Sequence, residues 1–171
     1  MPLGLDLAAI SAVDRSGNEI FVLGDKPWPQ LTHYGVSWEP DVLIEAYKRA
    51  LFPMPQEVQG ADDAIGWWSP AERAIFYPDR IRMTRSTKQS AKRFTVTFNT
   101  AFREVVIESA NPHRPDGWIT SDVMAGYGTL HDLGLAHSVE VWEGHKLVGG
   151  LYGVTVGGVF AGESMFHKVT N

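Results

Sequence analysis

Residues 138–164 read SVEVWEGHKLVGGLYGVTVGGVFAGES, and the spacing of their apolar side chains decides the fold class. Apolar residues recur here with the period of two that is typical of β-strands, whereas upstream they follow the helical period. The pattern predicts three strands, with bounds Ser138–Trp142, Lys146–Val154 and Val159–Ser164. Glycine stands in both joints, Glu143-Gly144 and Gly157-Gly158, and it suits hairpin turns because it adopts positive φ without steric cost. The stretch therefore predicts an antiparallel β-meander.

The segments upstream of the meander favour helices, so the predicted fold class is α+β. Helices are expected between Ser37 and Phe52, over Thr84–Lys92, after a cap at Asn99 or Thr100, and over Asp122–Leu133. Thr120 is the expected N-cap of the last helix, and Gly134 is expected to end it. Short strands are expected at Glu19–Leu23, Ala74–Tyr77 and Phe94–Phe98, and a loop over residues 54–64. We predict a small N-terminal α/β domain over residues 1–70 and a second domain over residues 71–171.

The composition is that of a globular protein and excludes several chemistries. Hydrophobic residues make up 44% of the 171 residues and charged residues 20%, so the chain can bury a core. The chain has no cysteine, which excludes disulfides, thiolate zinc ligands and cysteine nucleophiles, and its six histidines lack metal-binding spacing. The sequence shows no apolar run of membrane-spanning length and no secretory signal at Met1–Ile10. We therefore expect a cytoplasmic protein without a metal site.

A basic segment runs from Arg80 to Arg93 in a chain whose formal net charge is −5. It holds six of the chain's 15 Lys and Arg residues and no acidic residue. Arg85, Lys88 and Lys92 are spaced i, i+3 and i+7, which puts them in one row on a helix. Net negative charge argues against nucleic-acid binding, but a local cluster overrides it because screening limits each charge to about a Debye length. The row fits either a phosphate backbone or an ordinary solvated helix face.

Two further residues are candidates for chemistry. Trp118 stands just before the predicted cap Thr120, where it is either a pocket wall or a packing residue of the helix start. Glu163 stands near the end of the third predicted strand, on the face of Val159 and Ala161, with Phe160, Gly162 and Ser164 on the other face. A carboxylate beside an apolar run is costly unless it is hydrogen-bonded or used, so Glu163 is a candidate for amine binding or proton transfer. The alternative is a partly exposed glutamate at a sheet edge.

Eight short blocks then carry a family resemblance. They are residues 46–49 with Phe52-Pro53, 67–70, Arg85-Ser86 with Lys88, 118–120, 130–134, 136–142, 147–154 and 162–166. Together they resemble the leucyl/phenylalanyl-tRNA–protein transferase family over roughly Leu31–Asn171. The last blocks, LVGGLYGV and GESMF, are long and specific.

The resemblance implies a small N-terminal domain followed by a domain with the N-acetyltransferase fold. It implies an aminoacyltransferase that moves Leu or Phe, and Met less well, from aminoacyl-tRNA to the α-amine of proteins that begin with Arg or Lys, which marks them for degradation. No metal or coenzyme is expected, because the aminoacyl ester is already activated. The resemblance assigns tRNA binding to Arg85, Lys88 and Lys92, and an apolar amino-acid pocket to Trp118, Leu151 and Phe160. It makes Glu163 the candidate catalytic residue and matches Tyr47 and Tyr127 to family tyrosines at the substrate.

Three departures from the family pattern accompany these matches. Met54 follows Phe52-Pro53 where the family has Trp, Tyr34–Ser37 replaces a Gly-Gly-Asp-Leu loop, and Gln89 replaces a basic residue. The family also continues beyond Asn171 with a helix, further strands and an Asp and Gln motif assigned to catalysis. We therefore expect that these 171 residues alone do not form a stable, active monomer and that they self-associate through the edge at Val159–Ser164. The alternatives are an inactive tRNA- or protein-binding remnant and a coenzyme A-dependent N-acyltransferase, although no pyrophosphate-binding loop is visible.

Overall fold

The computed structural model describes residues 10–13, 19–22, 30–35, 37–58, 61–69, 75–80, 82–110 and 117–170. The chain forms two compact units. The first combines Met1–Val36 with Arg49–Ile81, and the second combines Ser37–Lys48 with Arg82–Asn171. The helix after Ser37 thus belongs to the same compact unit as the C-terminal half, and the domain boundary near residue 70 stays a prediction.

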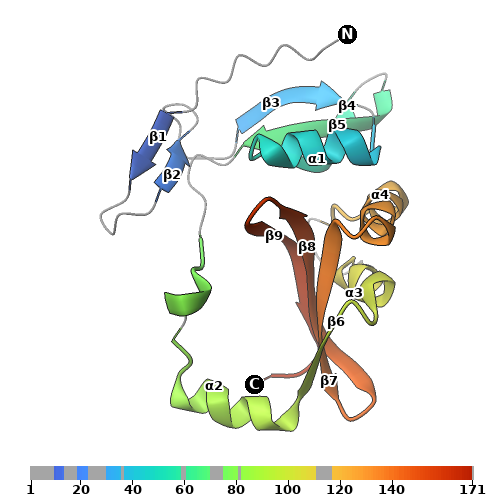
Figure 1. Ribbon diagram of the computed structural model, residues 1–171. Coiled ribbons are helices and arrows are strands. Elements are labelled where there is room, and N and C mark those ends of the chain that lie inside the picture. The colour runs from blue at the N-terminus through green and yellow to red at the C-terminus, as the bar shows by residue number, and fades with distance from the viewer. Residues whose placement is uncertain are drawn as a thin grey trace. The chain divides into compact units, whose positions relative to one another are not determined.

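The first unit is built from antiparallel strands (Figure 1). β1 (Ile10–Val13) pairs with β2 (Glu19–Val22), and a three-stranded sheet has the order β3 (Gln30–Gly35), β5 (Ala61–Ser69), β4 (Phe52–Val58). The prediction of a loop over residues 54–64 is wrong, because β4 and β5 occupy most of it. β4 contains Pro53 and Pro55, which have no backbone N–H to donate. They are tolerated because β4 is an edge strand and residues two apart face the same way, so both positions can face away from β5. The strand predicted at Ala74–Tyr77 is wrong over residues 75–77, which are irregular, and Ala74 lies outside the described residues.

The second unit contains the predicted meander, which is confirmed. Its sheet has the order β6-β7-β8-β9, all antiparallel, with bounds Thr95–Phe98, Ala136–Glu143, Lys146–Val156 and Val159–His167. Gly144 and Gly157 begin the two hairpin turns with φ of +62° and +58°, the conformation for which glycine was expected. Together with the helices, this sheet confirms the predicted α+β class.

The helices lie close to their predicted positions. α1 spans Pro40–Lys48, α2 Arg85–Ser90, α3 Phe102–Ser109 and α4 Ser121–Asp132, with short 3-10 helices at Pro78–Arg80 (η1) and Ala91–Arg93 (η2). Thr120 caps α4 by accepting the N–H of Val123, and Gly134 follows with φ of +73°, as predicted. The expected cap of α3 at Asn99 or Thr100 is wrong: Ala101 holds that position and provides no side-chain hydrogen bond. None of the described helices is long and apolar enough to cross a membrane.

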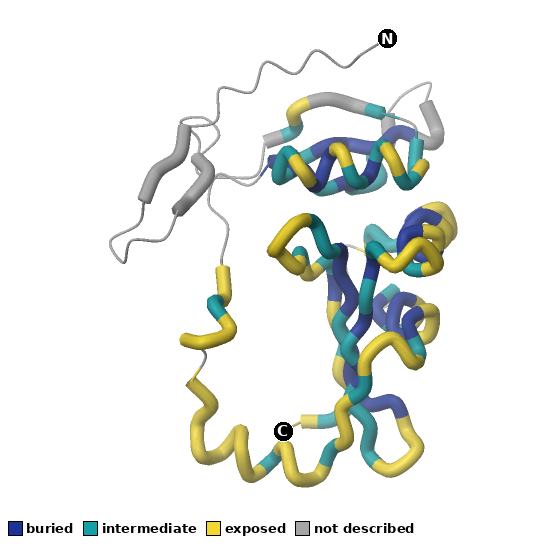
Figure 2. The backbone as a smooth tube through the Cα atoms, in the orientation of Figure 1, coloured by how far each residue is buried: buried dark blue, intermediate teal, exposed yellow. Residues whose placement is uncertain are grey.

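The core of the second unit lies between the sheet and one layer of helices. α3 contacts β7, β8 and β9, α4 contacts β7, and α1 contacts α4 and β8. Figure 1 shows α3 and α4 on the same side of the sheet, and Figure 2 colours stretches of both helices and of β8 as buried. The fully buried residues include Val105, Val123, Tyr127, Leu130, Tyr152 and Val154. We call this side of the sheet the helix-covered face and the other side the open face.

A β-bulge interrupts the pairing of β9 with β8. Tyr152 pairs with Ser164 and Gly153 with Gly162, so Glu163 is an extra residue without an opposite partner in the ladder. Residues directly opposite each other in an antiparallel pair point to the same face, and Tyr152 packs on α3 and α4. Ser164 therefore lies on the helix-covered face. The prediction that it shares a face with Phe160 and Gly162 is wrong, because the bulge shifts the alternation after Gly162.

Candidate active site

Three side chains from distant parts of the chain meet at the bulge. The hydroxyls of Tyr47 on α1 and Tyr127 on α4 are 2.6 Å apart, and Tyr127 Oη donates to Glu163 Oε2 at 3.0 Å. Both tyrosines are buried, whereas Glu163 is half-buried. The bulge turns Glu163 toward the helices, which is a common role of β-bulges next to functional sites. The sequence prediction singled out all three residues, and the structure brings them together.

The two tyrosine hydroxyls and the carboxylate form one hydrogen-bonded group. Tyr127 donates to the Glu163 carboxylate, and Tyr47 is hydrogen-bonded both to Tyr127 and to Glu163. Either hydroxyl can be the donor in the bond between the two tyrosines, because each has one hydrogen and free lone pairs. Contacts from both tyrosines hold the carboxylate in one orientation.

The tyrosines of this site remain neutral at any working pH. Burial raises the pKa of both Tyr47 and Tyr127 well above the ordinary value, and the nearby Glu163 carboxylate raises each pKa further. Burial and then the same carboxylate also raise the pKa of Tyr152 on β8. Of these four groups, Glu163 is therefore the one that can carry a negative charge. We call Tyr47, Tyr127, Tyr152 and Glu163 the tyrosine–glutamate cluster.

Tyr152 is the member of the cluster that the sequence prediction did not include. Its ring packs edge-on against Tyr127, with centroids 5.4 Å apart, and against Phe102 at 6.0 Å. Its hydroxyl is buried and has no hydrogen-bond partner among the described residues. A tyrosine at a core position of a glycine-rich strand gives no sequence signal beyond hydrophobic packing, which explains the omission.

A second glutamate of the same sheet, Glu140 on β7, is fully buried. Its carboxylate accepts hydroxyl hydrogen bonds from Ser138, from Thr97 at 2.6 Å and from Thr100 at 2.9 Å. The backbone N–H groups of Thr100 and Ala101, in the segment just before α3, also point to it at 3.5 Å. Burial alone raises the pKa of Glu140, but these hydrogen bonds outweigh it and lower that pKa below the ordinary value.

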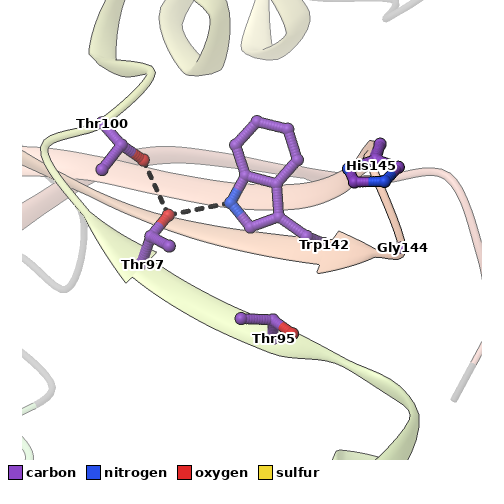
Figure 3. Close-up of a pocket in the computed structure, with 6 residues that line it drawn as sticks. All are labelled: Thr95, Thr97, Thr100, Trp142, Gly144 and His145. Carbon is purple, nitrogen blue, oxygen red and sulfur yellow. Dashed lines mark hydrogen bonds between the residues drawn. The ribbon is translucent and has the colours of Figure 1, made fainter.

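Thr97 extends this second cluster to the surface. Figure 3 shows its hydroxyl between Thr100 and the indole of Trp142, whose Nε1–H donates to it at 2.8 Å. The three side chains line an open hollow with Thr95, Gly144 and His145 (Figure 3). We call Glu140, Ser138, Thr97 and Thr100 the Glu140 cluster. The three hydroxyls all donate to the Glu140 carboxylate. A carboxylate whose hydrogen bonds come from its own chain is suited to a structural role.

Two of the residues predicted for the amino-acid pocket, Leu151 and Phe160, lie on the other face of the sheet from the tyrosine–glutamate cluster. Leu151 pairs with Met165, and its Cδ1 lies 3.5 Å from the position a Gly162 Cβ would take, so it belongs to the open face. Phe160 is 41% exposed and its ring tip approaches Gly153 on that same face. Trp118 is half-buried in the segment before α4. The pocket formed by Trp118, Leu151 and Phe160 stays a prediction.

The predicted tRNA-binding residues are all exposed. Arg85 and Lys88 lie on α2, whereas Lys92 lies on the 3-10 helix η2, so the α-helical row reaches only from Arg85 to Lys88. None of the three forms an ion pair with a described residue, in contrast to Arg93, which binds Glu143 at 2.9 Å. The described residues also contain no group of three or more His, Asp or Glu side chains placed to hold a metal ion.

Comparison with known proteins identifies the family. A sequence model of the leucyl/phenylalanyl-tRNA protein transferase matches residues 75–171, more than half of the chain, and a model of its N-terminal domain matches residues 38–71. The chain belongs to the leucyl/phenylalanyl-tRNA–protein transferase family. The predicted resemblance is confirmed, and with it membership of a family of enzymes.

Members of this family from Shewanella are similar to the chain over 141 residues. Identity is 49% with the leucyl/phenylalanyl-tRNA–protein transferase of Shewanella sediminis, 43% with that of Shewanella baltica strain OS155 and 44% with that of Shewanella sp. strain ANA-3. Each match covers 80% of this chain and 58% of the relative. The chain therefore corresponds to little more than half the length of these curated transferases.

Proposed function

We propose that this chain takes part in aminoacyl transfer, moving Leu, Phe or Met from aminoacyl-tRNA to the α-amine of proteins that begin with Arg or Lys. The observation that carries the proposal is the hydrogen-bond series Tyr47–Tyr127–Glu163 in a member of this transferase family. A carboxylate fixed by a neutral tyrosine can orient an amine and accept its proton. The product would be a degradation signal, and the reaction would take place in the cytoplasm.

The proposed reaction needs no coenzyme. The amine nitrogen attacks the carbonyl carbon of the aminoacyl ester, the C–N bond forms, and the ester bond to the ribose oxygen of the tRNA breaks. The amine gives up a proton and the leaving ribose oxygen takes one up. Glu163 is our candidate for the group that receives the amine's proton, while Tyr127 holds the carboxylate and Tyr47 holds Tyr127.

The two remaining parts of the proposal are binding surfaces. Arg85, Lys88 and Lys92 are exposed and free of ion pairs among the described residues, which suits contacts with tRNA phosphates. Leu151 and Phe160 present apolar surface on the open face, which suits the side chain of the transferred amino acid, with Trp118 beside the start of α4.

Transfer of radiolabelled Leu from Leu-tRNA to a protein with N-terminal Arg tests the proposal. The assay would use the chain alone and the chain extended by the additional C-terminal segment of a Shewanella relative. An acceptor whose N-terminal α-amine is acetylated is the matched control, since it lacks only the nucleophile. Label on the free acceptor and none on the acetylated one supports the proposal. Binding of tRNA without transfer by either form would favour the inactive remnant instead.

The tRNA-binding surface has a separate test. Changing Arg85, Lys88 and Lys92 to Ala should weaken tRNA binding whatever the tRNA sequence, because phosphate contacts carry no sequence information. The slope of log K against log[salt] should flatten by about 0.7–0.9 for each lost contact. Arg103→Ala is the control, since Arg103 is an exposed cation already paired with Asp132 at 2.8 Å. An unchanged slope in the triple variant would make the basic segment a solvated helix face.

A further inference from the structure

The Tyr152 hydroxyl is a buried polar group whose partner is not among the described residues. The side chain is fully buried, and its ring is fixed by edge contacts with Phe102 and Tyr127. Buried hydroxyls in folded proteins nearly always have a hydrogen-bond partner, because an unpaired one forfeits its bonds to water. The partner is then an ordered water, a residue outside the described ranges or a polar group of a ligand, and the chemistry around the hydroxyl argues for the ligand.

The position of this hydroxyl connects it to the tyrosine–glutamate cluster. Tyr152 stands opposite Ser164, immediately beside the bulged residue Glu163, and its ring lies against Tyr127, which donates to the Glu163 carboxylate. Tyr152 and Glu163 both contact Tyr127, and the Glu163 carboxylate adds to burial in raising the Tyr152 pKa. The hydroxyl and the carboxylate therefore serve one site on the helix-covered face.

The chemistry of this site favours a cation. Glu163 is the acid of the site, and the tyrosines stay neutral because their pKa values are raised. Tyr127 donates to Glu163 and Tyr47 is hydrogen-bonded to both, whereas the unpartnered Tyr152 hydroxyl has lone pairs that can accept from a ligand. A carboxylate with neutral oxygen acceptors around it matches an ammonium group, which has hydrogens to donate and no lone pair.

We propose that Tyr152 is a substrate-positioning residue whose hydroxyl, together with Glu163, binds a protonated α-amine. This inference rests on the proposed transfer, in which both reactants carry an α-amine: the aminoacyl group on the tRNA and the N-terminus of the acceptor protein. Their shared chemistry defines the ligand, and the experiment below distinguishes the two sources.

Tyr152→Phe is the decisive variant, because it removes one oxygen and keeps the ring that packs on Phe102 and Tyr127. Ser109→Ala is its matched control, since Ser109 also has a buried hydroxyl without a partner among the described residues and lies on α3 outside the cluster. Binding would be titrated with leucinamide, which has an α-ammonium, and with N-acetyl-leucinamide, which lacks it. The same titrations would compare Leu-tRNA with N-acetyl-Leu-tRNA, and an Arg-starting peptide with its Nα-acetylated form.

We expect Tyr152→Phe to weaken binding of leucinamide about 10-fold or more, as the loss of a hydrogen bond to a charged group requires. N-acetyl-leucinamide should bind equally poorly to the wild-type chain and to the variant, and Ser109→Ala should bind leucinamide like the wild type. If the site takes the aminoacyl group, the loss appears with Leu-tRNA; if it takes the acceptor, the loss appears with the Arg-starting peptide.

Equal binding of leucinamide to wild type and Tyr152→Phe, with a lower melting temperature in the variant, would overturn the inference and assign the hydroxyl to a structural water. Equal binding of the free and acetylated ligands to the wild type would overturn it as well. These binding results are independent of transfer. Binding that depends on the ammonium group, without any transfer, would contradict the proposed function and support the ammonium site. Transfer in which binding does not depend on the ammonium group would support the proposed function and contradict the site.

Discussion

Glu140 on β7 and Glu163 on β9 both point to the helix-covered face of one sheet, and both accept hydrogen bonds from hydroxyl groups. Glu140 is fully buried, lies opposite Gly150 in a regular part of the ladder, and receives three Ser and Thr hydroxyls. Glu163 is half-buried, stands on a bulge, and is held by a tyrosine from another element beside the unpartnered Tyr152 hydroxyl. The donors around Glu140 come from its own strand and the adjoining β6–α3 segment, whereas Tyr47 and Tyr127 are 80 residues apart.

This difference separates two uses of a buried carboxylate. Glu140 receives three hydroxyl donors of this chain, so its charge is compensated whether or not a ligand is present. The Glu163 site leaves hydroxyl lone pairs available to a ligand, and it is assembled from α1, α4, β8 and β9. We therefore expect changes at Glu140 to act on stability and changes at Glu163 to act on binding and transfer.

The largest effect is expected from Glu140→Ala. The change leaves the Thr97, Thr100 and Ser138 hydroxyls without their acceptor in a buried place, so the free energy of unfolding should fall by about 2–4 kcal/mol. Urea denaturation measures it. Glu143→Ala, at an exposed pair with Arg93, is the control and should cost less than about 1 kcal/mol. Equal losses in the two variants would contradict the structural role of Glu140.

Glu163→Gln should show the opposite pattern. The amide keeps the shape of the side chain but carries no charge and cannot take up a proton as a base, so transfer should fall about 100-fold, which is about 2.7 kcal/mol in the barrier. The free energy of unfolding should change by less than about 1 kcal/mol, because Tyr127 can still donate to the amide oxygen. The measurement is single-turnover transfer in the extended chain. A stability loss as large as that of Glu140→Ala would make Glu163 a structural anion too.

Removing one hydroxyl from each cluster should separate stability effects from transfer effects again, with smaller changes in both. Thr97→Val takes away the bridge between Trp142 and Glu140 and should cost about 1–2 kcal/mol in unfolding free energy, since the indole N–H loses its acceptor. Tyr47→Phe leaves Tyr127 still bonded to Glu163, so it should cost less in stability and slow transfer about 3–10-fold. Thermal unfolding and single-turnover rates on both variants test the pair. A greater stability loss for Tyr47→Phe would reverse the assignment of the two clusters.

The smallest effect is the acid response of Glu140. Its pKa is lowered in the folded chain, so the native state binds its proton less readily than the unfolded state. The stabilisation is therefore fully present above the ordinary glutamate range and is lost as the pH falls through the folded pKa. Urea titrations at descending pH should show a steeper loss for the wild type than for Glu140→Gln. Parallel curves for the two proteins would contradict the lowered pKa.

The sequence predicts the outline of this fold better than its clusters. The hairpins and α4 were predictable because Gly144, Gly157, Thr120 and Gly134 act through local backbone preferences. The prolines of β4 misled the prediction, because whether a strand lies at a sheet edge depends on its neighbours. Periodicity cannot locate the bulge at Glu163, since one inserted residue looks like a continuing alternation.

The clusters depend on contacts that no local pattern encodes. Tyr47 and Tyr127 were predicted only through the family resemblance, because a window of sequence cannot show that α1 and α4 meet. Glu140 was missed, since a carboxylate at a core position of a strand gains its donors from β6 and the start of α3. Tyr152 was missed because hydrophobic spacing cannot show whether a buried hydroxyl has a partner.

The bulge has a consequence for how β9 is built. Glu163 stands between two neighbouring pairs of the ladder: Gly162 lies opposite Gly153, and Ser164 lies opposite Tyr152. Deleting Glu163 outright would thus join two correct halves into a regular ladder without moving any other side chain to the wrong side. A substitution of Glu163 tests the role of its carboxylate, whereas a deletion tests whether the sheet needs a residue at this position. By this reasoning the nine residues of β9 comprise eight that pair in a regular ladder and one inserted residue, which is the acidic Glu163.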